Sequence, residues 1–219
     1  MAKKIGVVLS GCGVYDGAEI HESVITLLAL DRQGAEAVIC APNVAQMHVV
    51  NHLTGEVEEG ETRNVLVESA RIARGKITDL AEVRADQLDG LILPGGFGAA
   101  KNLCDFAVKG AECTVHPEVA RIVREVHRAG KPVAAVCIAP AVLARVLGDQ
   151  GPALTIGSDA ETAAALESLG AHHVACPVRE RVIDSDRKLI TTPAYMLAES
   201  ISEAAEGIEK TVAALLEMA

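Results

Sequence analysis

A cysteine near the middle of the chain has the sequence surroundings of a nucleophile. Cys137 follows an apolar run at 133–136 that is long enough for one buried strand and too short for a helix. From Pro140 the residues are mostly good helix formers, so Cys137 is predicted at a sharp strand-to-helix turn. Such a turn pushes a side chain clear of both elements, and the free N–H groups at a helix start stabilise a thiolate. We therefore expect a lowered thiol pKa; the alternative is a buried, inert cysteine.

Two consecutive glycines offer a second chemical feature. Gly95 and Gly96 follow an apolar run at 90–93, which predicts another buried strand. Glycine reaches backbone conformations closed to other residues, so amide N–H groups after this strand can face a ligand. A plain turn at the end of a strand is the alternative.

Composition limits the classes of function. The 219 residues are enough for one α/β domain, and we predict a single domain over 1–219. A net charge of −10, with two Tyr, two Phe and no Trp, argues against a nucleic-acid partner. No stretch approaches the ~20 apolar residues of a membrane span, and the apolar run at 5–9 is too short for a signal peptide. We expect a protein of the cytoplasm with no membrane partner.

The cysteines show neither a disulfide framework nor a metal site. They lie far apart along the chain, so reduced thiols are expected at Cys12, Cys40, Cys104, Cys113, Cys137 and Cys176. Cys113 and His116 have the spacing of one ligand pair, but no second pair accompanies them. We predict no metal and no other cofactor.

Alternating strands and helices must position these groups. Strands are expected at 3–10, 35–40, 90–93, 133–136 and 189–193, and helices at 16–28, 64–75, 117–130 and 199–218. A strand, a helix and a strand of these lengths form a parallel βαβ unit. In the first helix Ile20, Val24, Leu27 and Leu28 have the spacing of a core-facing stripe, with Glu22 near its edge.

Between the second strand and the second helix the periodicity fades. Residues 47–56 suggest a small hairpin, and its histidines, His48 and His52, are expected at the surface or in a loop.

Three motifs in this order resemble a known family. They are Gly-Ala-Glu-x-x-Glu at 17–22, Leu-Pro-Gly-Gly-Phe-Gly at 93–98, and Ala-Ala-Val-Cys-Ile-Ala-Pro at 134–140. Together they resemble the PfpI-like branch of the class I glutamine-amidotransferase-like superfamily, and within it the ElbB-like glyoxalases. The resemblance covers essentially the whole chain. It implies an α/β, flavodoxin-like three-layer αβα sandwich with a mainly parallel sheet and a nucleophile elbow.

The same resemblance implies roles for particular residues. Cys137 would be the nucleophile and Glu22 the carboxylate against its sulfur. The backbone N–H groups of Gly96 and Ile138 would form an oxyanion hole. The substrate pocket would be formed by Gly95, Cys12 and Pro140.

The implied reaction is a cofactor-independent conversion of glyoxal to glycolate. A thiolate attacks a 2-oxoaldehyde to give a hemithioacetal, whose oxyanion needs two fixed donors. A partly buried Glu22 would have a raised pKa and could move a proton between the two carbons. The partner is then a small aldehyde, apparent deglycase activity could follow from consumption of free aldehyde, and the family's tendency implies a homodimer.

An alternative class remains open. A redox-sensing or regulatory module, linked by its family name to isoprenoid metabolism, would use the same acidic thiol for oxidation rather than turnover. Sequence does not separate the two.

One departure from the family pattern concerns histidine. Many relatives place a histidine about twenty residues after the cysteine, whereas residues 155–159 contain none. His172 or His173 could substitute, but nothing in the sequence places either near Cys137. No His-x-Glu pair follows Cys137, so amidotransferase and thiol-protease activity are disfavoured.

Overall fold

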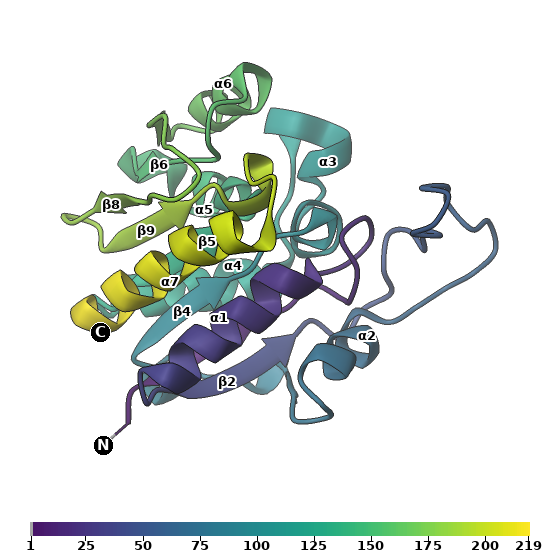
Figure 1. Ribbon diagram of the computed structural model, residues 1–219, viewed down its shortest axis with the longest axis horizontal. Coiled ribbons are helices and arrows are strands. Elements are labelled where there is room, and N and C mark those ends of the chain that lie inside the picture. Colours follow the sequence, from purple (N-terminus) through teal and green to yellow (C-terminus); the bar gives the residue numbers. More distant parts are fainter. Residues whose placement is uncertain (1) are drawn as a thin grey trace.

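The computed structural model describes residues 2–219 and shows a parallel sheet between two layers of helices (Figure 1). The sheet has seven strands in the order β3-β2-β1-β4-β5-β9-β8, and only the β8–β9 pair is antiparallel. These strands are β1 (Lys4–Val8), β2 (Glu36–Ala41), β3 (Thr78–Asp79), β4 (Gly90–Leu93), β5 (Val133–Val136), β8 (Val182–Asp184) and β9 (Leu189–Thr192). A separate parallel pair joins β6 (Ala153–Leu154) to β7 (His172–His173).

Helices cover both faces of the sheet. One face carries α1 (Ile20–Arg32), α2 (Val65–Ile72) and α7 (Ile201–Met218). The other carries α4 (Pro117–Arg128) and α5 (Pro140–Leu147), extended by α3 (Phe106–Lys109) and α6 (Ala160–Ser168). The central strands β4 and β5 are buried throughout because both of their faces are covered. The predicted flavodoxin-like three-layer αβα sandwich is confirmed.

The strand order places a binding edge at the carboxyl ends of β1, β4 and β5. From β1 the chain moves outward to β2 and β3, and then returns to β4 on the other side of β1. Such a reversal opens a crevice beyond the strand ends, where ligands of open α/β sheets bind. The loops that carry the Gly-Gly motif and Cys137 both leave the sheet at this edge.

The prediction of which side of the first helix faces the core is largely wrong. Ile20, Val24 and Leu28 are 43%, 48% and 41% exposed, so three residues of the predicted core-facing stripe face outward, and Leu27 alone of the four packs against the core. The buried side of α1 holds Glu22, Ser23 and Thr26 together with Ile25, Ala29 and Leu30. Packing against α7 and the Cys137 loop sets this orientation, and periodicity alone could not distinguish the two sides.

The excursion between β2 and α2 forms an arm that projects from the body of the molecule (Figure 1). Val50 and Val57 form an isolated antiparallel bridge, which matches the small hairpin predicted there. Within residues 2–219, no helix has both the length and the apolar character needed to cross a membrane.

Candidate active site

Cys137 lies at a strained turn between β5 and α5. Its φ of 62° is in the left-handed region that non-glycine residues rarely adopt, which is the geometry of a nucleophile elbow. Its N–H donates to the Thr192 carbonyl at 2.9 Å, so the next strand along the sheet, β9, fixes the turn. The side chain is 7% exposed, at the floor of a cavity.

Two backbone amides point at the Cys137 sulfur. The N–H groups of Gly96 and Ile138 both donate to it, one from the loop after β4 and the other from the residue that follows the nucleophile. These are the two donors predicted for the oxyanion hole. An oxyanion that forms on a carbon attached to this sulfur would develop beside the same pair of N–H groups.

Glu22 is the third component and is completely buried. Its Oε2 accepts from the Gly95 N–H at 3.0 Å, and its Oε1 accepts from the Tyr195 N–H at 3.2 Å. The carboxyl also shares a hydrogen bond with the Cys137 thiol. Each oxygen is therefore held in place, with the carboxyl against the thiol.

Glycines allow this close approach. A Cβ on Gly95 would lie 2.4 Å from Cys137 Cβ and 2.6 Å from Glu22 Oε2, so no larger residue fits between them. Gly96, with φ of 94°, and Gly98 pack against the backbone of Gly17, where an added Cβ would come within 2.5 Å of the Gly17 carbonyl carbon or oxygen. The Gly-Gly motif thus brings the start of α1 to the nucleophile.

The expected low pKa of the Cys137 thiol is wrong. Burial raises the pKa of the Cys137 thiol well above its usual value, and the charge of Glu22 raises it further. The Gly96 and Ile138 N–H groups act in the opposite direction without prevailing. Burial likewise raises the pKa of Glu22 to about 8, so the carboxyl is largely protonated at neutral pH. The helix start therefore does not make Cys137 a stable thiolate; the thiol and the carboxyl act as one proton-sharing pair.

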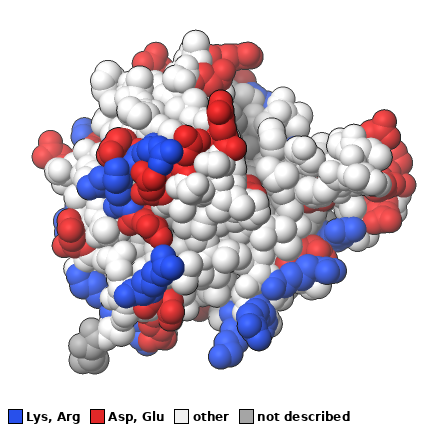
Figure 2. Space-filling view, viewed as in Figure 1, with Lys and Arg blue, Asp and Glu red and all other residues white. Residues whose placement is uncertain are grey.

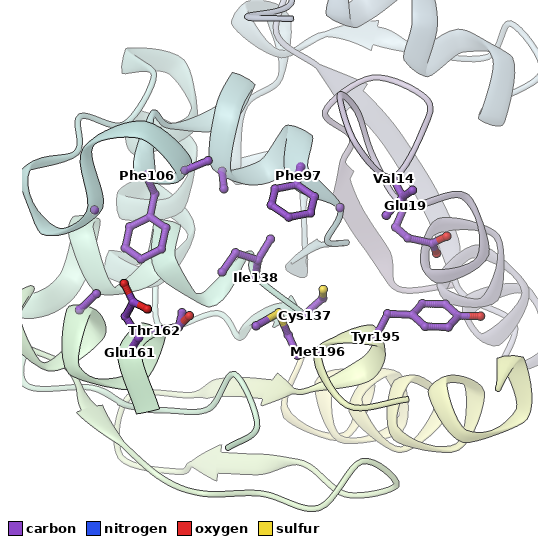
Figure 3. A pocket seen from close by; sticks show the side chains of 15 residues that line it. Val14, Glu19, Phe97, Phe106, Cys137, Ile138, Glu161, Thr162, Tyr195 and Met196 are labelled. Carbon is purple, nitrogen blue, oxygen red and sulfur yellow. The ribbon is translucent and has the colours of Figure 1, made fainter. Parts of the chain in front are cut away.

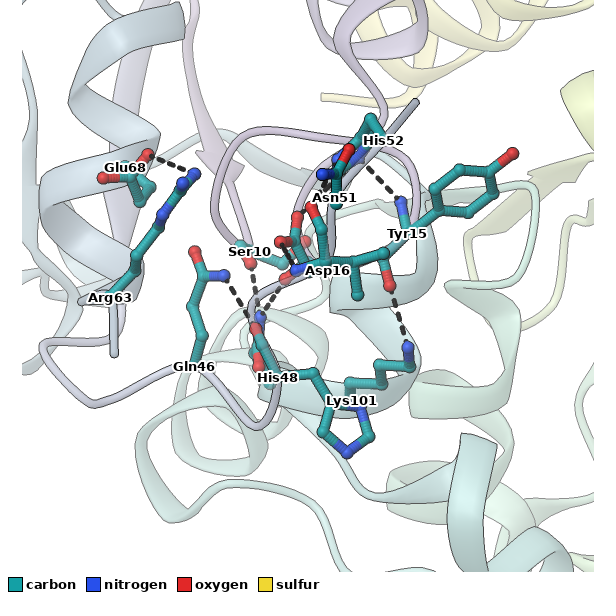
Figure 4. Close-up of polar contacts among 12 residues, drawn as sticks. Ser10, Tyr15, Asp16, Gln46, His48, Asn51, His52, Arg63, Glu68 and Lys101 are labelled. Carbon is teal, nitrogen blue, oxygen red and sulfur yellow. Dashed lines mark hydrogen bonds and ion pairs between the residues drawn. The ribbon is translucent and has the colours of Figure 1, made fainter. Parts of the chain in front are cut away.

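Hydrogen bonds from two other segments anchor the loop before α1 (Figure 4). Asp16 is buried and accepts from the Val50 N–H at 2.7 Å, while the Tyr15 N–H donates to His52 Nε2 at 3.2 Å. Asn102 Nδ2 donates to the Asp16 carbonyl at 2.9 Å. These bonds tie the loop to the projecting arm and to the segment after β4, and so position the first turn of α1, which carries Glu22.

The cavity above Cys137 has a volume of about 600 Å³. Figure 3 shows the sulfur between a wall containing Phe106, Glu161 and Thr162 and an opposite wall containing Val14, Glu19 and Tyr195. Phe97, Ile138 and Met196 add further apolar surface. The site is a largely apolar pocket with a thiol at its floor.

The three residues predicted for the pocket do not line it. Cys12 lies on the α2 side of its loop, within the electrostatic influence of Glu68 and Arg71. Pro140 is buried in the first turn of α5. Gly95 is beneath the pocket, packed on Cys137 and Glu22. Sequence proximity to the motifs suggested these residues, but the direction of each chain segment takes them elsewhere.

None of the histidines in the described part of the chain lines the pocket. His172 and His173 are in β7, in the small separate sheet, and neither reaches Cys137. His116 is the N-cap of α4, where its Nδ1 accepts from the Glu118 N–H at 3.2 Å. Among residues 2–219, no three His, Cys, Asp or Glu side chains are grouped as a metal site.

Sequence reasoning missed the turn after β9. Tyr195 supplies an N–H to Glu22 and lines the pocket together with Met196. Ala194, just before it, has a φ of 42°, a second strained residue at the site. The available signal was the strand predicted at 189–193, just before this turn, but its place beside β5 is a property of the tertiary fold.

Fold and site together define a class I glutamine amidotransferase-like α/β protein with a cysteine at the elbow. The family model described as DJ-1/PfpI family matches residues 12–198, and the chain belongs to this family. It is 50% identical to the human glutamine amidotransferase-like class 1 domain-containing protein 3, mitochondrial, over 99% of this chain and 84% of the relative. It is 36% identical to the mitochondrial ES1 protein of Danio rerio, over 88% of this chain and 76% of the relative.

Solved structures agree with this assignment. A protein from Ehrlichia chaffeensis, described as an isoprenoid biosynthesis protein with amidotransferase-like domain, has a TM-score of 0.91 and 38% identity. The match covers 98% of this chain and 99% of that one. Drosophila melanogaster DJ-1beta has a TM-score of 0.57 at 22% identity, covers 100% of this chain and 96% of that one, and is similar in fold.

Proposed function

We propose that this protein is a cofactor-independent glyoxalase that converts glyoxal to glycolate. The observation that carries the proposal is the contact of one thiol with a buried carboxyl and two backbone N–H donors. A nucleophile, an acid–base group and an oxyanion site are the three components that an aldehyde-to-hydroxyacid conversion needs.

In the first step Cys137 attacks one carbonyl carbon of glyoxal. Its proton passes to the Glu22 carboxylate, and the new oxyanion accepts from the Gly96 and Ile138 N–H groups. Return of the proton from Glu22 to this oxygen gives the neutral hemithioacetal. Because Glu22 is already in contact with the thiol, the sulfur becomes nucleophilic as the aldehyde arrives and need not be a thiolate at rest.

In the second step Glu22 moves a proton between carbons. The carboxylate removes the hydrogen from the carbon bonded to sulfur as a proton, which leaves an enediolate. Glu22 then returns the proton to the neighbouring carbon, and the hydroxyl proton of the first carbon passes to the oxygen of the second. The product is a thioester of glycolate on Cys137. Water cleaves it to glycolate and the free thiol, so glyoxal and one water are consumed for each glycolate. A pKa of about 8 suits this role, because both protonation states of Glu22 are accessible near neutral pH.

The alternative, a redox-sensing or regulatory module, has less support. Sensor cysteines are exposed and have low pKa values, whereas burial raises the pKa of Cys137. A link to isoprenoid metabolism rests on the description of the Ehrlichia protein and is a hypothesis for this chain. The location in the cytoplasm also stays a prediction, since the names of both cited relatives include the word mitochondrial.

The deciding experiment is glycolate formation from glyoxal without glutathione or added metal. Wild type and Cys137→Ser are compared side by side, with Cys176→Ser as a control for loss of a thiol outside the site. We expect turnover by the wild type and the control, and none by Cys137→Ser. If neither the wild type nor either variant makes glycolate, the glyoxalase proposal is wrong and the sensor hypothesis replaces it.

We also propose a homodimer that uses the outer face of α1. Its exposed apolar residues Ile20, Val24 and Leu28 repeat every fourth residue and form a continuous stripe. Figure 2 shows that the surface over the N-terminal half of α1 is largely uncharged and is bordered by charged side chains. An apolar stripe of this kind is typical of an association surface.

A further inference from the structure

The cavity is larger than glyoxal requires. Glyoxal has four non-hydrogen atoms, whereas cavities of about 300–1,000 Å³ hold drug-sized ligands. The volume above Cys137 is about 600 Å³. Glyoxal bound at the sulfur would leave most of this space to water.

The walls favour an apolar, ring-sized occupant. Phe97 and Phe106 enter from the segments after β4, and Ile138 and Met196 lie nearer the sulfur (Figure 3). Phe97 is 47% exposed, although it borders the site. Lys101 Nζ lies 5.3 Å from the Phe97 ring centroid and donates to the Tyr15 carbonyl at 2.8 Å, which restrains the ring. An aromatic side chain held at a cavity wall with half of its surface uncovered offers a contact for an apolar substrate.

The charges at the pocket argue against an anionic substrate. Glu161 lies on one wall and Glu19 on the other, and the residues that line the cavity include no Lys, Arg or His. The Glu19 carboxylate caps α1 by accepting from the Glu22 N–H at 2.7 Å, so it is held in place. A negatively charged group on the substrate would meet two carboxylates in a pocket of low polarity, and no cationic side chain among the lining residues would pair with it.

From size, lining and charge we infer that the preferred substrates are 2-oxoaldehydes with an uncharged apolar substituent about as large as an aromatic ring. This inference rests on the proposed function and narrows its substrate class. The chemistry at sulfur is unchanged: phenylglyoxal, the probe substrate, takes up one water and becomes mandelate. The thiol adds to the aldehyde carbon, Glu22 moves that carbon's hydrogen to the ketone carbon, and hydrolysis releases the acid.

The first arm of the test measures the pocket without relying on turnover. Cys137 is alkylated with 2-bromoacetophenone or with its 4-carboxylate, and each rate, measured by peptide mass mapping, is divided by the rate for glutathione. We expect the neutral reagent to be favoured at least tenfold. Phe97→Ala should reduce that preference at least threefold, and Val108→Ala, which changes an exposed residue outside the lining, should not.

Glu161→Gln should raise the relative rate of the anionic reagent at least twofold, while Glu167→Gln on the same helix should leave it unchanged.

The second arm compares kcat/KM for phenylglyoxal and glyoxal, with the acids measured by chromatography. We expect phenylglyoxal to exceed glyoxal at least tenfold. Turnover of glyoxal with an equal or higher kcat/KM, or equal normalised alkylation rates, would overturn the inference and leave the glyoxalase proposal intact. Selective alkylation without turnover of either aldehyde would overturn the glyoxalase proposal and uphold the apolar, anion-excluding pocket.

Discussion

The N-terminal half of α1 buries several polar side chains on its inner face and exposes apolar ones on its outer face. The inner face carries Glu22, Ser23 and Thr26, all fully buried, and the outer face carries Ile20 and Val24, both more than 40% exposed. Burying an unpaired carboxyl is costly, so this arrangement is stable only where the surroundings provide hydrogen bonds. Glu22 and Ser23 have them: Gly95 and Tyr195 donate to Glu22, and Ser23 Oγ donates to the Glu19 carbonyl at 2.7 Å, whereas the Thr26 hydroxyl has no partner among the described residues. The buried polar face is therefore evidence of a site.

The largest expected effect comes from the inner face. Glu22→Gln removes the proton acceptor, so glyoxal turnover should fall by roughly 10²–10⁴-fold, the usual contribution of general acid–base catalysis. Wild-type kcat/KM should rise from pH 6 toward pH 8 as Glu22 ionises, and the variant should lack this rise. Glu209→Gln, an exposed glutamate that pairs with Arg32, is the matched control. Unchanged glyoxal consumption in Glu22→Gln would contradict the mechanism.

The same variant should retain a reactive thiol. The Glu22 charge raises the pKa of Cys137, so replacing it with an uncharged side chain should lower that pKa. In iodoacetamide alkylation followed by mass mapping, the midpoint of the Cys137 pH profile should shift to lower pH. A shift to higher pH would mean that Glu22 does not act on the sulfur as a charge.

A further prediction concerns how the free energy of unfolding depends on pH. The folded-state pKa of Glu22, about 8, lies above its ordinary value of 4.5, so the fold favours the protonated carboxyl. The stabilisation of the fold by protonated Glu22 is fully present below pH 4.5 and is lost as the pH rises toward 8. The free energy of unfolding should fall by up to about 5 kcal/mol over this range. In a Cys137→Ser background, which removes the coupled thiol, Glu22→Gln should lack this loss between pH 5 and pH 9. Urea unfolding at several pH values measures the free energy of unfolding of Cys137→Ser and of the double variant. The same pH dependence in both proteins would refute the prediction.

The next prediction tests the contact between the inner face of α1 and the turn that carries Cys137. Gly95→Ala forces a methyl group against Cys137 and Glu22, so the free energy of unfolding should fall by about 1–3 kcal/mol and turnover should fall at least tenfold. Gly90→Ala, at the start of β4, the strand that precedes the Gly95 loop, is the control, because its nearest neighbour would lie 3.2 Å away at the end of a flexible side chain. Equal effects of the two changes would show that the tight contact at Gly95 has no special role.

The smallest effect on folding is expected on the outer face. Val24→Glu should change the unfolding free energy of the monomer by about 0.5 kcal/mol or less, because the position is exposed. It should nevertheless convert the proposed dimer to a monomer, as measured by light scattering after size exclusion. Val67→Glu, an exposed valine on α2, should remain dimeric. A wild type that is monomeric at micromolar concentration would refute the proposed interface.

Local sequence determined the elements and the elbow. The short apolar run before Cys137 and the proline after it were sufficient to predict a strand, a turn and a helix, and all three are present. The strand, the turn and the helix were predictable because strand length and proline position act over a few residues. The roles of Glu22, Gly96 and Ile138, which lie around the sulfur, came instead from the resemblance of the three motifs to a known family.

The tertiary structure decided the rest. Which face of α1 is buried, the raised pKa values of Cys137 and Glu22, and the pocket lining by Tyr195 and Met196 all depend on segments distant in sequence. Periodicity marks an apolar stripe but does not say whether the core or a partner covers it. A helix start favours a thiolate, but burial beside a carboxyl outweighs it, and burial is a property of the packed molecule.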